Sequence, residues 1–132
     1  MEKDETKVLL GDHDGRLTKG SHPDLVKYHY AQQLERQKEI FGGVVRYNMA
    51  HVVMMTEQGV FSKEDSSKLL KGLKEIESLG VAGFPMSPEY QSIHPNMEAF
   101  LVKRYGYEVG GQILTGRARG DVQHTGEVRR QT

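Results

Sequence analysis

The sequence contains no cysteine, carries no formal net charge and has no long apolar run. Without cysteine the chain forms no disulfide and holds no thiolate-bound metal, which fits a reducing compartment. Eighteen basic and eighteen acidic residues cancel, so the overall charge gives no reason to expect nucleic acid as a partner. No apolar run reaches membrane-spanning length, and the acidic residues 1–6 do not form a secretory signal. We therefore expect a cytoplasmic protein without a membrane partner.

Motifs that mark metal and nucleotide sites are also missing. The six histidines form no metal-ligand spacing, and the sequence has neither an HExxH motif nor an aspartate-rich calcium loop. It has no Walker loop, no dinucleotide fingerprint and no GxSxG turn. The sequence therefore contains no motif that marks a metal site or a nucleotide site.

The pattern of apolar residues predicts a mostly α fold with no convincing alternating strand, in a chain of 132 residues, the length of one domain. A short helix is expected to start at Ser21 or Asp24 and to run through Tyr28. A longer helix follows over residues 34–58. Glycines 42–43 interrupt it, which predicts a local kink or a close helix crossing.

The next helix has the clearest boundary signals. Ser62 followed by Asp65 resembles a capping box, and Gly80 is a left-handed stop after the apolar stripe, so the helix is expected over residues 62–79. Residues 59–61 join it to the preceding helix. Such a short connection predicts an antiparallel helical hairpin.

The chain beyond this hairpin is richer in glycine and proline. Residues 80–92 are expected to be a loop, and a helix is expected to start at Pro95 and to end at Gly106. The segment 112–115 is too short to classify. The polar stretch from Gly120 onward has no terminating signal, so we expect the chain to need other polypeptide to complete its core.

The densest polar cluster lies at residues 115–121. Arg117 and Arg119 stand between glycines, an arrangement that presents two guanidinium groups and backbone N–H groups to an anion such as a carboxylate. The alternative is a solvated basic turn in which Asp121 pairs within the segment. Spacing alone leaves both interpretations open.

A second candidate site is the segment 92–96. His94 stands directly before a predicted helix N-terminus, where an imidazole binds an anion or exchanges a proton near neutral pH. The alternative is that His94 only caps the helix and that Asn96 points to water.

Five segments occur in the order found in one enzyme family. They are Gly15-Arg16-Leu17-Thr18, the helix junction 57–62, Ile93-His94-Pro95-Asn96-Met97-Glu98, Tyr105-Gly106 followed by Gly110-Gly111, and Leu114-Thr115-Gly116-Arg117-Ala118-Arg119-Gly120-Asp121. In this order and spacing they resemble the N-terminal portion of argininosuccinate lyase, a family of the aspartase/fumarase superfamily.

The resemblance implies a helical N-terminal domain, truncated at the start of the central helical bundle. It implies a β-elimination that splits an N-substituted aspartate into fumarate and an amine or guanidine such as arginine, with no cofactor. Family members are homotetramers whose active sites combine segments of three subunits. The implied substrate-binding residues are Thr115, Arg117, Arg119, Asp121 and Asn96, with His94 at the edge of the active site as a possible catalytic residue.

The resemblance also implies a domain organisation. Residues 1–20 are expected to form an extended arm, 21–113 the helical N-terminal domain, and 114–132 the substrate-binding turn and the beginning of the truncated central domain. Because the family's catalytic loop and proton-abstracting group do not appear in the sequence, the isolated chain is expected to show no turnover.

Three positions depart from the family pattern. Leu114 stands in place of a histidine, Gly120 in place of a substrate-binding asparagine, and Ala31 in place of a serine. Losing such polar partners costs about 1–3 kcal/mol each in a buried site. We therefore expect either another N-substituted aspartate as substrate or a degenerate lyase. Two further hypotheses stay open: a non-catalytic helical interaction module, and an anion-binding or nucleic-acid-binding turn.

Overall fold

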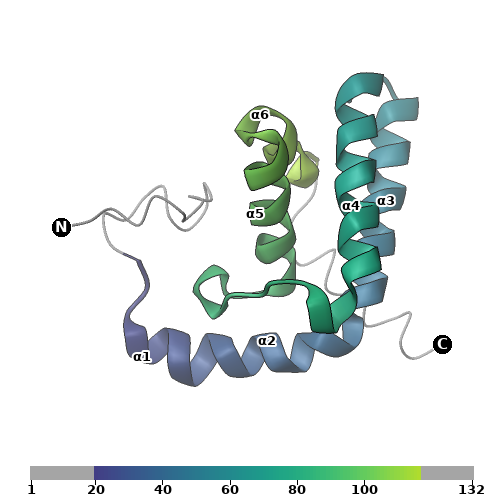
Figure 1. Cartoon of the computed structure of the whole chain (residues 1–132). Coiled ribbons are helices and arrows are strands. Elements are labelled where there is room, and N and C mark those ends of the chain that lie inside the picture. The colour runs from purple at the N-terminus through teal and green to yellow at the C-terminus, as the bar shows by residue number, and fades with distance from the viewer. Residues whose placement is uncertain (1–19, 117–132) are drawn as a thin grey trace.

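The computed structural model of the chain describes residues 20–116. Within this range every regular element is a helix, which confirms the mostly α prediction (Figure 1). The expected N-terminal arm, except for Gly20, and the predicted site residues Arg117, Arg119 and Asp121 lie outside the described residues.

The first helical stretch is longer than predicted. It consists of α1 (Pro23–Leu25), a π-helical turn (Val26–Tyr30) and α2 (Ala31–Gln37). The cap is neither Ser21 nor Asp24 but His22, whose Nδ1 accepts a hydrogen bond from the Asp24 backbone N–H at 3.2 Å. The stretch does not end at Tyr28, because no glycine or proline follows until residue 42 to interrupt it.

The predicted kink is present, but it precedes the glycine pair. A 3₁₀ turn (Lys38–Ile40) separates α2 from α3 (Phe41–Glu57), and Ile40 departs from helical geometry at φ −97° and ψ 1°. In Figure 1, α2 consequently runs across the lower end of α3. A Cβ atom on Gly42 would meet nothing within 4 Å, so no close crossing occurs at that glycine.

Helices α3 and α4 (Lys63–Gly83) form the predicted antiparallel hairpin (Figure 1). Gly59, at φ +73°, follows the end of α3, and the Ser62 side chain accepts a hydrogen bond from the Asp65 N–H at 3.1 Å. Gly80 takes the predicted left-handed conformation at φ +67°. The expected loop over 80–92 is wrong in part, because one helical turn continues to Gly83 and a 3₁₀ turn forms at Pro88–Tyr90.

Helix α5 (Ile93–Tyr105) starts two residues before Pro95 and ends, as predicted, at Gly106. Helix α6 (Tyr107–Gly110) and a 3₁₀ turn (Gly111–Leu114) complete the described fold.

The close helix approaches occur at two other glycines. A Cβ on Gly72 in α4 would lie 2.5 Å from Leu101 Cδ2, and one on Gly110 would collide with the backbone of Val102. Glycine at these positions lets α4 and α6 approach α5 closely.

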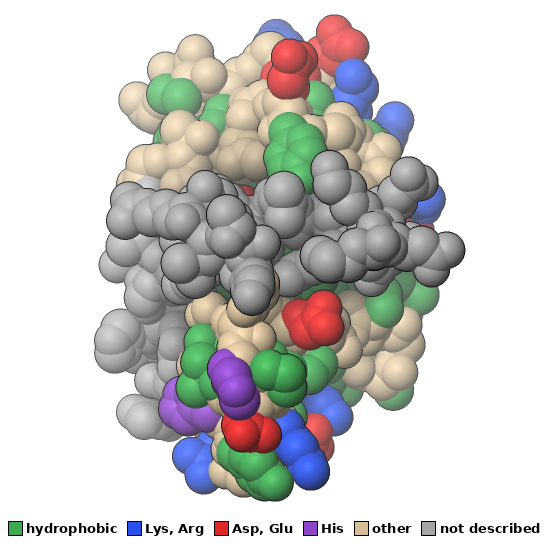
Figure 2. All heavy atoms as spheres, turned by 90° about the vertical axis from the view of Figure 1, so that its left-hand side faces the viewer, with side chains coloured by type: hydrophobic (Ala, Val, Ile, Leu, Met, Phe, Trp, Pro, Cys, Tyr) green, Lys and Arg blue, Asp and Glu red, His purple; other side chains and the backbone are tan. Residues whose placement is uncertain are grey.

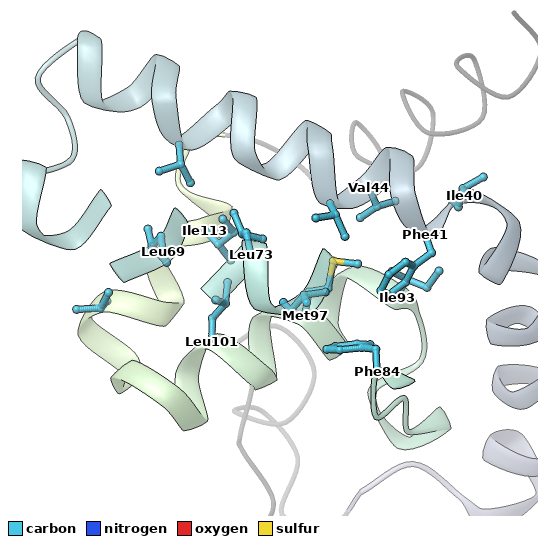
Figure 3. Close-up of a cluster of buried hydrophobic side chains, with 14 of the residues drawn as sticks. Ile40, Phe41, Val44, Leu69, Leu73, Phe84, Ile93, Met97, Leu101 and Ile113 are labelled. Atoms are coloured by element: carbon cyan, nitrogen blue, oxygen red, sulfur yellow. The ribbon is translucent and has the colours of Figure 1, made fainter. Parts of the chain in front are cut away.

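The larger hydrophobic cluster of the described residues lies between α3, α4 and α5, and Figure 3 shows side chains from these helices converging there. Ring contacts extend this core toward the segment after α4, where Phe84 lies 5.6 Å, centroid to centroid, from both Phe41 and Phe100. At the surface, Arg104 of α5 donates a hydrogen bond to Glu75 of α4, and this bond raises the pKa of the Arg104 guanidinium. The three helices therefore form one packed unit.

The N-terminal helical stretch contributes apolar side chains to the surface. Leu25 and Tyr28 are exposed. Figure 2 views the molecule from the left-hand side of Figure 1, and it shows apolar, charged and histidine side chains mixed at the lower end of this face. Over residues 20–116, no helix has the length and apolar character needed to cross a membrane.

Candidate functional site

His94 lies in the first turn of α5 and is buried, with 5% of its surface exposed. Its Nε2 lies 3.3 Å from Oδ1 of Asn48 on α3, and Asn48 itself is fully buried. The Asn48 amide nitrogen donates to the Met97 sulfur at 3.7 Å. His94 therefore faces α3 in the interior, and the cap position that the alternative interpretation gave to His94 is occupied by Ser92.

The N-terminus of α5 is hydrogen-bonded by Gln37 and not by His94, the cap that the sequence suggested. Ser92 occupies the cap position without a side-chain capping bond. Instead the Ile93 N–H donates to Oε1 of Gln37, a buried residue at the end of α2, at 3.0 Å. This contact ties the bend between α2 and α3 to the start of α5.

Asn96, predicted as a substrate-binding residue, is buried and hydrogen-bonded to the preceding loop. Its Oδ1 accepts from the Ser87 N–H at 2.7 Å, and its Nδ2 donates to the carbonyl oxygens of Ser87 and Ser92 at 3.0 and 2.8 Å. Its amide thus holds residues 87–92 against α5. The alternative that Asn96 points to water is wrong.

Thr115 and Gly116, the described part of the predicted arginine turn, are exposed. The Thr115 carbonyl oxygen lies 2.9 Å from Nε2 of His51 on α3. Gly116 has φ +77°, a conformation that favours glycine, and a Cβ there would lie 3.6 Å from Met55 Cε. The Thr115–Gly116 turn therefore packs against α3.

One face of α3 carries both candidate segments. Asn48, His51 and Met55 follow each other at intervals of three and four residues, so they lie on the same face of the helix. Asn48 contacts the His94 segment, and one turn further His51 contacts Thr115. Two segments singled out separately in the sequence are thus brought to neighbouring turns of one helix.

Sequence reasoning missed Gln37, Asn48 and His51. A signal was present at two of them, because Asn48 and His51 interrupt an apolar stripe on a helix that is otherwise buried on that face. Polar residues at such positions need hydrogen-bonding partners. The identity of those partners was not available from spacing.

Arg117, Arg119 and Asp121 are not placed, since they lie outside the described residues. Between residues 20 and 116, no group of three carboxylate, imidazole or thiol side chains is arranged to bind a metal ion. A groove of about 490 Å³ lies between α3 and α4, and its walls include Val53, Thr56, Leu70 and Lys71. These α3 residues lie on a different face from Asn48 and His51, so the groove is separate from the candidate site.

Among the comparisons with known proteins, the comparison with curated sequences finds relatives. No protein-family model matches the chain, and no solved structure gives a significant match. Over 107 residues, the chain is 39% identical to the argininosuccinate lyase of Methanocaldococcus jannaschii, 38% to that of Methanosarcina acetivorans and 36% to that of Methanococcus maripaludis.

The matched region is 81% of this chain but only 21–22% of each relative, so the chain spans about one fifth of the length of the curated proteins it matches. The identity extends through most of the helical fold described above. The family resemblance of the sequence is confirmed: over four-fifths of its length, this chain is a homologue of argininosuccinate lyases.

Proposed function

We propose that this chain is part of a carbon–nitrogen lyase that splits an N-substituted aspartate into fumarate and an amine or guanidine. The observation that carries the proposal is that the His94 segment and the Thr115 turn contact neighbouring turns on one face of α3, in a chain 35–39% identical to argininosuccinate lyases. The geometry favours a site assembled at this face over a site in the groove between α3 and α4.

The proposed reaction is a β-elimination. A base removes a proton from the carbon next to a carboxylate, the carbon–nitrogen bond breaks, and the leaving nitrogen takes up the electron pair and a proton. The intermediate carries extra negative charge on a carboxylate, which guanidinium groups stabilise. In this proposal Arg117 and Arg119 bind the carboxylates, the exposed Thr115 contributes to the same turn, and Asp121 braces it.

The buried residues take supporting roles in the proposal. His94 is hydrogen-bonded to Asn48 inside the fold, and Asn96 holds the loop 87–92, so neither is arranged to contact substrate within the described residues. We assign both to the support of α5. The proton-abstracting base is then expected from other polypeptide, in keeping with a cytoplasmic homotetramer whose sites combine several subunits.

The experiment is a graft into a related enzyme. Residues 15–121, which span the resembling segments, replace the matching region of the Methanocaldococcus jannaschii argininosuccinate lyase, and fumarate release is followed by its ultraviolet absorbance. The substrates are argininosuccinate and ethylenediamine disuccinate, since Leu114 and Gly120 predict a changed preference. We expect turnover of at least one N-substituted aspartate by the graft and none by the isolated 132-residue chain.

A helical interaction module is the second candidate, because Val53, Met54 and Val60 expose apolar surface on the hairpin. A graft that folds and assembles like the parent lyase but splits neither substrate would contradict the lyase proposal and favour the module. Circular dichroism and the oligomer mass of the graft separate this result from misfolding.

A further inference from the structure

We propose that His51 is a positioning residue that fixes the Thr115–Gly116 turn; its role in catalysis rests on the proposed function. His51 lies on α3, is 8% exposed, and places Nε2 2.9 Å from the Thr115 carbonyl oxygen. The two residues are 64 positions apart, so this bond ties the turn to the middle of the hairpin.

Packing sets the direction of the His51 ring. The Phe61 ring meets it edge to face, with centroids 6.3 Å apart and planes at 78°. Phe61 is buried, and its backbone N–H donates to the Met55 carbonyl at 3.2 Å, which ties it to the end of α3. A ring held in this way keeps Nε2 directed at Thr115.

The chemistry of the pair fixes the donor. A carbonyl oxygen only accepts hydrogen bonds, so Nε2 of His51 must carry the proton. In the neutral imidazole this requires the Nε2–H tautomer, and a protonated ring donates from the same atom. The tether therefore depends on a hydrogen on one particular nitrogen.

The bond acts on the peptide between Thr115 and Gly116. The Thr115 N–H donates to the Gln112 carbonyl at 2.8 Å, its own carbonyl accepts from His51, and Gly116 then turns at φ +77°. These contacts fix the peptide plane between Thr115 and Gly116. A small misplacement of binding groups is enough to slow a reaction about 100-fold.

The first test needs no substitution. In the 132-residue chain, long-range ¹H–¹⁵N spectra of histidine at mildly alkaline pH identify the tautomer of His51. We expect the Nε2–H form. A ring protonated only at Nδ1 would overturn the inference, because Nε2 would then have no hydrogen to donate to Thr115.

The second test compares two substitutions in the same chain. His51→Phe keeps a planar ring without a donor, and His51→Gln returns a side-chain N–H. We expect His51→Phe to shift the Gly116 amide ¹⁵N resonance and to speed hydrogen exchange of the Thr115 amide at least tenfold, and His51→Gln to restore most of both. Val52→Ala, a neighbouring core change, is the matched control and should leave the Gly116 resonance in place. An unchanged Gly116 resonance in His51→Phe would contradict the tether.

The third test measures the consequence in the grafted lyase described above. His51→Phe should lower kcat/KM at least tenfold beyond the effect of Val52→Ala, and His51→Gln should recover most of the loss. Equal kinetics for the Phe and Gln variants would overturn the positioning role. If the graft is inactive while the spectra show the bond, the proposed function fails and the His51 tether stands.

Discussion

The two candidate segments contact the same face of α3 but differ in their surroundings. In the first, His94 and Asn96 are 5% and 3% exposed, and their side chains bond to other parts of the fold. In the second, Thr115 and Gly116 are exposed, and the described contacts that hold them run through the backbone and His51. One segment is built into the interior, and the other is presented at the surface.

This difference separates residues that support the fold from residues that are exposed to a ligand. A buried polar group costs about 1–3 kcal/mol when its partner is removed, so the His94 segment has little freedom to release its bonds for a substrate. An exposed turn has solvent-accessible groups and needs only to be held in one direction. We therefore expect substitutions in the first segment to lower stability and substitutions in the second to lower activity.

The largest expected effect is on activity. Arg119→Ala in the grafted lyase should lower kcat/KM at least 100-fold, because a carboxylate ligand is lost, while the unfolding temperature stays unchanged. Steady-state kinetics measure this effect. Arg104→Ala, which removes an exposed arginine paired with Glu75, is the control and should leave the kinetics within twofold. Equal kinetics for the two variants would remove the arginine turn from the proposed site.

The next effect is on stability. Asn96→Ala removes the partner of the Ser87 N–H and two donors to the loop, and should cost about 3 kcal/mol in the free energy of unfolding, measured by urea denaturation of the 132-residue chain. Asn96→Asp keeps the Oδ1 acceptor but turns a carboxylate oxygen toward the carbonyl oxygens of Ser87 and Ser92 in a buried site, so it should not recover the loss. In the graft, a loss of kcat/KM at undiminished stability would show that Asn96 contacts substrate after all.

A glycine pair tests the packing that connects the two segments. Gly110→Ala places a methyl group against the Val102 backbone and should cost about 2 kcal/mol in unfolding free energy. Gly111→Ala is the matched control, since nothing lies within 4 Å of its added Cβ. Urea denaturation of both variants measures the difference. Similar stabilities would mean that α6 shifts away from α5 at no cost.

The smallest effect concerns the hairpin on which both segments depend. Ser62→Ala removes the side-chain cap of α4 and should cost about 1 kcal/mol. Ser67→Ala, an exposed serine on the same helix, should change stability by less than about 0.5 kcal/mol. In Ser62→Ala, hydrogen exchange of the backbone amides should become faster by the same factor in the two segments. Faster exchange in only one segment would show that the two do not depend equally on the hairpin.

Local signals predicted much of the fold. Ser62 caps α4, Gly59 and Gly106 follow helix ends, and Gly80 takes a left-handed conformation, as the sequence indicated. Each of these features depends on residues three or four positions away, and so it is visible in a short window. The bend at residues 38–40 was misplaced at the glycines because conformational freedom alone does not determine where a helix turns.

The amino-acid sequence by itself determined the helical class, the helix ends at Gly59, Ser62 and Gly106, and the ordered segments that identify the family. Only the tertiary structure decided which polar side chains meet, since Asn48 and His94 are 46 positions apart and His51 and Thr115 are 64 apart. Such pairs depend on how α3, α4 and α5 pack, and that packing depends on close approaches at Gly72 and Gly110 that no local pattern reveals. The physical reason is that helix ends form from short-range hydrogen bonds, whereas the candidate site forms from contacts that exist only once the core has closed.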